Sequence, residues 1–284
     1  MKSAAIGINK NYSCKNEYAP IKKVITAAPL YMQIEEAINE TQKYYMKENI
    51  DRSEALRQHS NFIHVLRHEG IEVIELPVKK NLPEQIFTRD IGFVIKNKLF
   101  ISTMAKNIRQ TEVDIFKDWL EERGMDFKLC FSGIEGGDVV VDEDTLWIGC
   151  SQRTSFQAIC SLEKEFPEHT IKTVQLEKNM LHLDCAFNII GRDTAIIYPP
   201  AIDEASYHLM QCQYHLIEVT NEEQFNMGPN VLSIGNKTVI SLPENKRLNH
   251  KLHEAGFEVI EVEFSEIIKS GGSFRCCTLP LLRG

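Results

Sequence analysis

Five short groups of small and polar residues recur along the chain, and their residue types could do chemistry. They read FTRD at 87–90, EGGD at 135–138, HLD at 182–184, GPN at 228–230 and GGSFRC at 271–276. Several ionisable groups crowded into one cavity would cost stability, so their concentration in these groups suggests a catalytic or binding site. A cysteine beside a histidine in such a cavity is a candidate nucleophile whose thiolate the neighbours can stabilise.

The last residues of these five groups are evenly spaced. From Asp90 through Asp138, Asp184 and Asn230 to Cys276, the intervals are 48, 46, 46 and 46 residues. This regularity predicts that each group occupies the same place in a repeated unit.

The residues between the groups predict the elements of that unit. After each of the first four groups come an apolar run, a polar turn (KNK, DED, GRD or GNK) and a second apolar run, which together indicate a β-hairpin. Val113, Phe116 and Leu120 then recur at helical spacing. RHEGIEVIELP (67–77) and LHEAGFEVIEVE (252–263) both read as a helix end, a glycine and a strand. Each unit is therefore predicted to be strand, strand, helix, strand.

The two ends of the chain complement each other. The fifth group is followed by only one apolar run, whereas VITAAP (24–29) is a strand followed by a helix over 52–69 and another strand. The N-terminal strand would complete the last unit and close a ring, which removes sheet edges. The sequence thus predicts an α/β propeller of five pseudo-symmetric ββαβ units, one domain over residues 1–284, with the five groups converging on a central cavity.

The composition excludes several classes of protein. The 284 residues carry a formal net charge of −8, which argues against a nucleic-acid partner and fits a small cationic ligand. The N-terminus is too polar for a signal peptide and no run approaches the roughly 20 apolar residues of a membrane span, so we expect a cytoplasmic protein. Eight cysteines without a CxxC pair are expected to be thiols, mostly in the core.

Simpler explanations of the same residues stay open. Asp and Gly start hairpins well, a single strand histidine is usually a core residue, and a buried cysteine often acts as a small hydrophobe. His182, Asp184, Glu135 and Asp138 could also bind a metal, but no local ligand spacing supports this and a cysteine would be an unneeded soft ligand. If residues 276 and 277 lie in a strand, Cys277 faces the core and only Cys276 faces the axis.

With SQRT at 151–154, these motifs resemble the guanidino-group-modifying enzymes, the pentein or amidinotransferase superfamily, in the family's order across nearly the whole chain. That superfamily includes arginine deiminases, dimethylarginine dimethylaminohydrolases and amidinotransferases. The resemblance implies the pentein fivefold αβ propeller that the spacing predicts. It also implies a hydrolase without cofactor or metal that forms citrulline from a guanidino amino acid, releasing ammonia or a methylamine through a covalent thiouronium intermediate.

The resemblance implies a role for each matched residue. Cys276 attacks the guanidinium carbon, His182 protonates the leaving nitrogen and later activates water, and Glu135 orients His182. Asp90 and Asp184 hold the planar guanidinium. The other candidate substrate-binding residues are Arg153, Arg109, Arg89, Asp138 and Asn230. Among these, Arg153 matches the arginine that holds the substrate α-carboxylate and Arg109 is a weaker candidate, although both also fit ordinary surface helix residues.

Choosing among the family members depends on finer features. The chain lacks room for the extra helical domain of bacterial arginine deiminases, so its size resembles a dimethylargininase. Arg89 and Asp184 stand where dimethylargininases tend to carry Glu and Lys, and a second carboxylate at 184 favours an unsubstituted nitrogen. Arginine or an N-methylated arginine is the predicted substrate, with amidino transfer to an amine and non-catalytic guanidinium binding as alternatives. Whether the chain forms a homodimer, whether residues 34–51 form a lid or pack as core, and what Arg275 does are left open.

Overall fold

The computed structural model describes residues 12–130 and 132–284, which form five small three-stranded sheets. In each sheet two strands pair antiparallel, as a hairpin in four of the sheets, and a third strand runs parallel to the second of them. The first unit contains β3 (Gly92–Ile95), β4 (Lys98–Ile101), α3 (Gln110–Glu122) and β5 (Lys128–Leu129). The second contains β6 (Val139–Asp142), β7 (Thr145–Cys150), α4 (Phe156–Glu165) and β8 (Thr170–Gln175).

The remaining units repeat this order. The third contains β9 (Phe187–Gly191), β10 (Thr194–Ile197), α5 (Glu204–Gln213) and β11 (His215–Glu218). The fourth contains α6 (Asn221–Phe225), β12 (Leu232–Gly235), β13 (Thr238–Ser241), α7 (Lys246–Glu254) and β14 (Glu258–Glu261). The fifth contains β15 (Leu279–Arg283), β1 (Ile21–Thr26), α1 (Glu40–Tyr45), α2 (Arg52–His68) and β2 (Glu72–Glu75).

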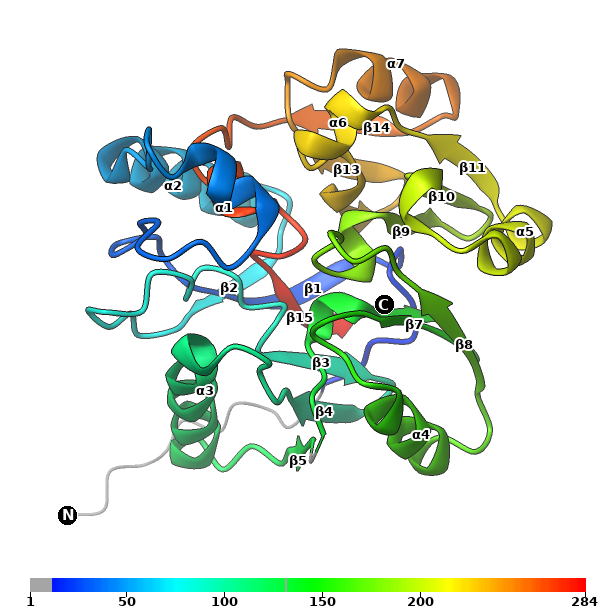
Figure 1. Ribbon diagram of the computed structural model, residues 1–284, viewed down its shortest axis with the longest axis horizontal. Helices are drawn as coiled ribbons and strands as arrows, with labels where there is room; N and C mark the ends of the chain where they lie inside the picture. Colours follow the sequence, from blue (N-terminus) through cyan, green and yellow to red (C-terminus); the bar gives the residue numbers. More distant parts are fainter. Residues whose placement is uncertain (1–11, 131) are drawn as a thin grey trace.

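The five sheets surround a common centre, with α2, α3, α4, α5 and α7 on the outside (Figure 1). This confirms the predicted fivefold propeller of ββαβ units. The apolar stripe read from the sequence forms the inner face of α3, where Val113, Phe116 and Leu120 are buried against the strand residues Leu99 and Ile101. Burial of such a stripe is the main force that fixes each helix on its sheet.

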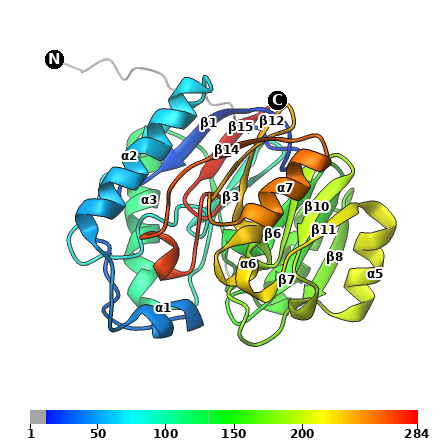
Figure 2. The same cartoon turned by 90° about the horizontal axis from the view of Figure 1, so that it is seen from above.

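The fifth sheet joins the two ends of the described chain. In it β1 pairs antiparallel with β15 and parallel with β2, so the order is β15-β1-β2. The register pairs Val24 with Pro280 and Ile25 with Leu279. The C-terminus therefore lies on one face of the ring, while α1 lies at the opposite face (Figure 2).

The polar groups lie where each unit begins. EGGD, HLD and GPN end in the short 3₁₀ helices η2 (Gly136–Asp138), η3 (Leu183–Cys185) and η5 (Gly228–Asn230), each just before the first strand of its unit. Cys276 and Cys277 lie in a turn before β15 rather than in a strand, so the strand geometry expected for the pair is wrong. Among the described residues, no helix has the length and apolar character needed to cross a membrane.

Candidate active site

A narrow pocket lies where the polar groups meet beneath the α1 face of the ring. It is lined by the carboxylates of Glu84 and Asp90, the guanidinium groups of Arg109 and Arg153, and Cys276. Its free volume is about 10 Å³, whereas a polar groove of about 350 Å³ lies directly outside it and shares Arg153 with it. A volume of this order holds roughly one water molecule, so a larger ligand can enter only if side chains or the covering segment move.

Asp90 is held by an arginine through one of its two oxygens. Arg109 Nη1 donates to Asp90 Oδ2 at 2.6 Å, and Arg109 Nη2 also donates to Glu112 Oε2 at 2.9 Å. Asp90 Oδ1 is buried and has no hydrogen-bond partner among the described residues. Because an unpaired buried carboxylate oxygen is costly, Asp90 Oδ1 is an acceptor site for a ligand N–H.

His182 and Glu135 form a buried acid–base pair. His182 Nε2 lies 2.7 Å from Glu135 Oε2, and His182 Nδ1 lies 3.5 Å from Asp90 Oδ1. Burial lowers the pKa of His182, but the charge of Asp90 and the hydrogen bond to Glu135 outweigh it and raise the pKa to about 10. Burial raises the pKa of Glu135, but the hydrogen bond and charge of His182 prevail and lower it to about 2. The pair is therefore charged at neutral pH.

The EGGD glycines make this approach of His182 possible. A Cβ at residue 137 would lie 2.7 Å from His182 Nδ1 and 3.1 Å from Asp90 Oδ1. Such contacts are too short for a methyl group, so Gly137 lets the imidazole lie against the backbone of the second unit.

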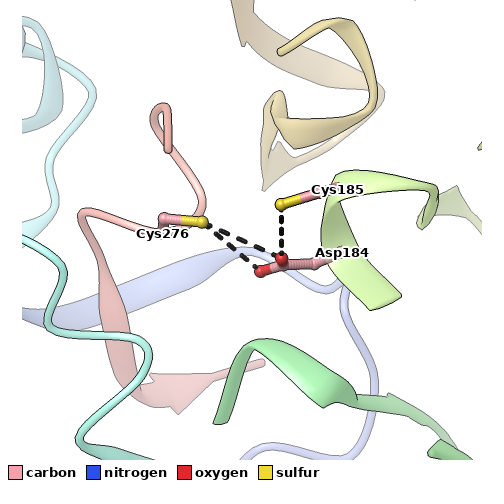
Figure 3. Close-up of side chains that lie close together, drawn as sticks. All are labelled: Asp184, Cys185 and Cys276. Atoms are coloured by element: carbon pink, nitrogen blue, oxygen red, sulfur yellow. Dashed lines mark hydrogen bonds between the residues drawn. The ribbon is translucent and has the colours of Figure 1, made fainter. Parts of the chain in front are cut away.

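Cys276 lies beside a second carboxylate. Its Sγ is 3.8 Å from both oxygens of Asp184, which is completely buried and lies outside the pocket lining (Figure 3). Arg275 Nη1 donates to Asp184 Oδ2 at 2.7 Å, and Arg275 Nη2 lies 3.0 Å from Glu17 Oε1. Arg275 thus has a defined place, since it holds Asp184 as Arg109 holds Asp90.

Arg153 joins the pocket to its cover. Arg153 Nη2 donates to the carbonyl oxygen of Ile38 at 3.0 Å, and Nη1 lies 3.5 Å from Glu135 Oε1. Both Arg153 and Arg109 are buried, which excludes the alternative that they are ordinary surface helix residues. Arg153 Nη1 has no hydrogen-bond partner among the described residues and is available to an anion.

Besides Asp184, three of the residues expected to bind substrate lie outside the pocket. Asp138 accepts from Leu183 N at 2.9 Å and from Ser151 Oγ at 2.6 Å, which joins two units and fixes the turn that carries Arg153. Asn230 Oδ1 accepts from Cys276 N at 3.1 Å. The Arg89 guanidinium faces Glu17 Oε2 at 3.6 Å instead of the pocket. These contacts hold the site residues in place and do not line the space for a ligand.

Within residues 12–130 and 132–284, two sets of side chains have ligand atoms close enough to hold a metal ion. One set is Asp90, Glu135 and His182, and the other is Asp184, Cys185 and Cys276, with all ligand atoms within 4.8 Å of one another in each set. The sequence suggested His182, Asp184, Glu135 and Asp138 as possible metal ligands. These residues do not form one set, because Asp184 lies in a different set from Glu135 and His182, and Asp138 belongs to neither.

The cover of the pocket is a segment whose helix is shorter than the sequence suggests. Within residues 34–51 only α1 (Glu40–Tyr45) is helical, so Ile34 and Ile38 precede it. Gln42 is completely buried and its Nε2 donates to Glu84 Oε1 and to Ser270 Oγ, both at 2.7 Å. Sequence reasoning missed Glu84, although an acidic residue six positions before Asp90, in the loop that leads to it, is the signal that could have found it.

The sequence also matches a known family. Residues 28–283 match the family model described as N,N dimethylarginine dimethylhydrolase, eukaryotic. The chain belongs to this family. The match confirms the resemblance to the guanidino-group-modifying enzymes, and this dimethylarginine dimethylhydrolase family includes hydrolases that act on arginine-type guanidino groups.

The chain is also similar to individual proteins of known sequence or structure. The chain is 49% identical to the protein YkgA of Bacillus subtilis over 95% of each chain. It is 26% identical to the bifunctional arginine dihydrolase/ornithine cyclodeaminase ArgZ of Synechocystis, covering 90% of this chain and 37% of ArgZ. The solved N-terminal domain of ArgZ with bound product, from a cyanobacterial arginine dihydrolase, superposes with a TM-score of 0.84 at 25% identity, covering 92% of this chain and 97% of that domain.

Proposed function

We propose that the protein is a cysteine-dependent hydrolase of the guanidinium group of arginine or an N-methylated arginine, forming citrulline and releasing ammonia or a methylamine. The observation that carries this proposal is the paired arrangement of Asp90 and Asp184. Each carboxylate is held by an arginine through Oδ2; within the described part of the chain, Oδ1 of Asp90 has no hydrogen-bond partner and the hydrogen bonds of Asp184 Oδ1 come from sulfur atoms. Two such oxygens beside a thiol fit a planar cation with several N–H donors.

In the proposed reaction, the two Oδ1 atoms accept hydrogen bonds from the substrate guanidinium and present its central carbon to Cys276 Sγ. The thiolate adds to this carbon, and His182 donates a proton from Nδ1 to the departing nitrogen. The carbon stays bound to sulfur as a thiouronium group. His182 then takes a proton from water, whose oxygen adds to the carbon. As the C–S bond breaks, the remaining hydroxyl proton passes to solvent, and citrulline and the thiolate are released.

The charged form of His182 suits the first of these steps. With a pKa of about 10 it carries the proton that the leaving nitrogen requires at neutral pH. Glu135 supports this form through its hydrogen bond at 2.7 Å and a second acceptor contact to Ala105 N at 2.9 Å that orients the carboxylate. Glu135 therefore acts in the proposal as a positioning residue.

The other end of the substrate meets positive charge in this proposal. Arg153 lies at the junction of the pocket and the outer groove, and Lys106 and Lys178 line the same groove. These side chains suit an α-carboxylate, so the proposal predicts a preference for amino acids over decarboxylated amines. Arginine is favoured over methylated arginine because two carboxylates need unsubstituted N–H donors.

The test is an assay of the purified protein with arginine, monomethylarginine, dimethylarginine and agmatine, in which citrulline, ornithine and ammonia are all quantified. One ammonia and one citrulline per arginine, with agmatine turned over far more slowly, support the proposal. Ornithine with two ammonia molecules indicates a second hydrolysis, and dependence on an added amine indicates amidino transfer. Binding of arginine without any product indicates a non-catalytic protein.

The remaining expectations are part of the same proposal. We infer that residues 1–284 act as one domain in the cytoplasm. The chemistry above uses only side chains of this chain, without a cofactor or a metal ion. The domain expectation is tested by limited proteolysis, because one protected core fragment is expected rather than two.

A further inference from the structure

A second thiol faces the proposed nucleophile. Cys185 directly follows Asp184 in η3, and its Sγ lies 3.6 Å from Asp184 Oδ1, while Cys276 Sγ lies 3.8 Å from the same oxygen. The two Sγ atoms are within 4.8 Å of each other. Cys276 from the loop before β15 and Cys185 from η3 both point toward the Asp184 carboxylate (Figure 3).

Packing does not account for the position of Cys185. Its neighbours Leu183 and Ala186 belong to the hydrophobic cluster of the third unit, but among the described residues Cys185 belongs to no such cluster. A buried cysteine that serves only as a small hydrophobe would lie among apolar side chains. The sulfur of Cys185 instead faces a carboxylate and a thiol, and the proposed hydrolysis gives it no task.

We propose that Cys185 is a resolving cysteine, which forms a reversible disulfide with Cys276 when a peroxide oxidises the site. The Cys276 thiol loses its proton and the thiolate attacks one oxygen of hydrogen peroxide; the O–O bond breaks, Cys276 becomes a sulfenic acid, and the departing hydroxide takes up the thiol proton as the first water. Cys185 then loses its proton and attacks Cys276 Sγ, the S–O bond breaks, and hydroxide leaves with that proton as the second water. Two thiols are oxidised and one peroxide is reduced.

The geometry suits this exchange better than any pairing with the adjacent Cys277. An S–S bond is about 2.05 Å long, so Sγ atoms that begin within 4.8 Å must approach by less than about 3 Å. Side-chain rotation moves sulfur over such a distance. Cys276 and Cys277 both contact the hydrophobic cluster around Phe62, but only Cys276 also belongs to the Asp184 group. A disulfide would remove the nucleophile and protect it from irreversible oxidation until a thiol reductant restores it.

The experiment uses the full chain in a Cys277→Ala background, with a chelator present so that a bound metal cannot mimic oxidation. The protein is treated with hydrogen peroxide and its free thiols are alkylated. It is then digested with trypsin without reduction, and the peptide masses are measured by mass spectrometry. We expect a cross-link between residues 179–192 and 276–283, with a mass two hydrogens below the sum, which disappears on reduction. Absence of this cross-link, or linkage of Cys276 to another cysteine, would overturn the proposal.

A second measurement follows activity and rests on the proposed function. After peroxide treatment and reduction, the parent protein is expected to recover most of its starting turnover, and Cys185→Ala a several-fold smaller fraction, with Cys276 carrying a sulfinic acid. The exposed Cys212, replaced by alanine, is the matched control and should behave as the parent does. Equal recovery in Cys185→Ala and the parent would contradict the proposal. Cys185→Ser, similar in size and unable to cross-link, replaces the alanine variant if that variant does not fold.

The mass measurement separates this proposal from the proposed function. A cross-link in a protein that turns over no guanidino compound would support the disulfide and refute the hydrolase. Turnover without a cross-link would support the hydrolase and refute the disulfide.

Discussion

At the scale of single residues, the backbone of Cys276 is held from two sides. Its N–H donates to Asn230 Oδ1 at 3.1 Å, and its carbonyl oxygen accepts from Arg89 N at 3.0 Å. The polar groups of the fourth and first units therefore fix the residue that the fifth unit supplies. Because both contacts involve the backbone, a change of the Cys276 side chain should leave the turn intact.

Replacing Cys276 with serine tests whether Cys276 is the nucleophile, because the backbone hydrogen bonds should keep the turn in place. We expect turnover to fall by at least about a thousandfold, because a hydroxyl at this position is a far weaker nucleophile. Cys277→Ser is the matched control: it places a hydroxyl in an apolar cluster and should cost about 1 to 3 kcal/mol of stability, while folded protein keeps most of its turnover. Equal losses of turnover in the two variants would show that Cys276 is not the nucleophile.

The acid–base pair makes a prediction about the pH profile. The Glu135 anion stabilises protonated His182, so Glu135→Gln should lower the pKa of the imidazole from its value of about 10. The alkaline fall of kcat/KM should then begin at lower pH than in the parent, and kcat/KM should drop by about 10²-fold or more. An unchanged alkaline limb, measured across pH 6 to 11, would show that Glu135 does not act through His182.

At the scale of elements, the α1 segment is fastened to the site by polar contacts. Gln42 binds both Glu84 and Ser270, Asn39 Nδ2 donates to the Ser270 carbonyl oxygen at 2.9 Å, and Arg153 binds the Ile38 carbonyl oxygen. Gly271, with φ of +91°, turns the chain directly after Ser270. The glycine of this motif therefore shapes the loop against α1, where the backbone takes a left-handed conformation that favours glycine.

Glu84 makes this anchor sensitive to pH. Burial raises the pKa of Glu84 to about 7, against the opposing charge of Arg109. Since the folded state binds the proton more tightly than the unfolded state, the contribution to stability is fully present below about pH 4.5 and is lost as pH rises toward 7. Glu84→Gln has no carboxylate here and does not lose this stability. Between pH 4.5 and 7, the free energy of unfolding of the variant should therefore rise relative to that of the parent by up to about 3 kcal/mol.

Denaturant unfolding at pH 4.5, 5.5, 6.5 and 7.5 measures this difference. Asp138, whose pKa burial raises to about 6, titrates in the same range but is present in both proteins and cancels. Glu121→Gln on the exposed face of α3 is the control and should follow the parent at every pH. Parallel curves for Glu84→Gln and the parent would show that Glu84 ionises normally.

The sequence predicts the elements better than the contacts between them. The 46-residue spacing identifies the units because the last residue of each group occupies an equivalent place in its unit. These residues meet at the centre, where Asn230 is hydrogen-bonded to both Cys276 and Asp184. The same spacing cannot tell a residue that lines the pocket from one that joins two units, since both occupy equivalent positions. Cys185 escaped notice because it lies one residue after its group, where only the turn of η3 brings its sulfur toward Asp184.

At the scale of the whole molecule, residues 12–20 cross the ring on the face opposite α1. Cys14 N donates to the Lys96 carbonyl oxygen in the first unit, Asn16 forms a bridge with Asp142 in the second, and Ser13 pairs with Leu282 in the fifth. This segment lies outside the repeats, so no period in the sequence points to it. It carries Glu17 to the centre of the ring.

Glu17 balances a group of buried cations there. Arg275 Nη2 and Arg89 Nη2 lie 3.0 and 3.6 Å from its two oxygens, and the buried Arg283 lies nearby. Burial raises the pKa of Glu17, but these arginines outweigh it and lower the pKa to about 2. Burial lowers the pKa of Arg283 to about 10, against the opposing charge of Glu17. Glu17 is thus a buried carboxylate whose charge is shared by arginines of different units.

Glu17→Gln removes the negative charge and leaves the arginines buried without it, so we expect the free energy of unfolding to fall by about 3 to 5 kcal/mol at pH 7. Because the folded pKa is depressed, the stabilisation is fully present above about pH 4.5 and is lost as pH falls toward 2. The gap between variant and parent should therefore be constant from pH 5 to 7 and narrow in more acid solution. Glu121→Gln, in an exposed pair with Lys117, should change stability by less than about 1 kcal/mol at any pH. If the free energy of unfolding fell no more in Glu17→Gln than in Glu121→Gln, the charges of the buried arginines would be balanced without Glu17.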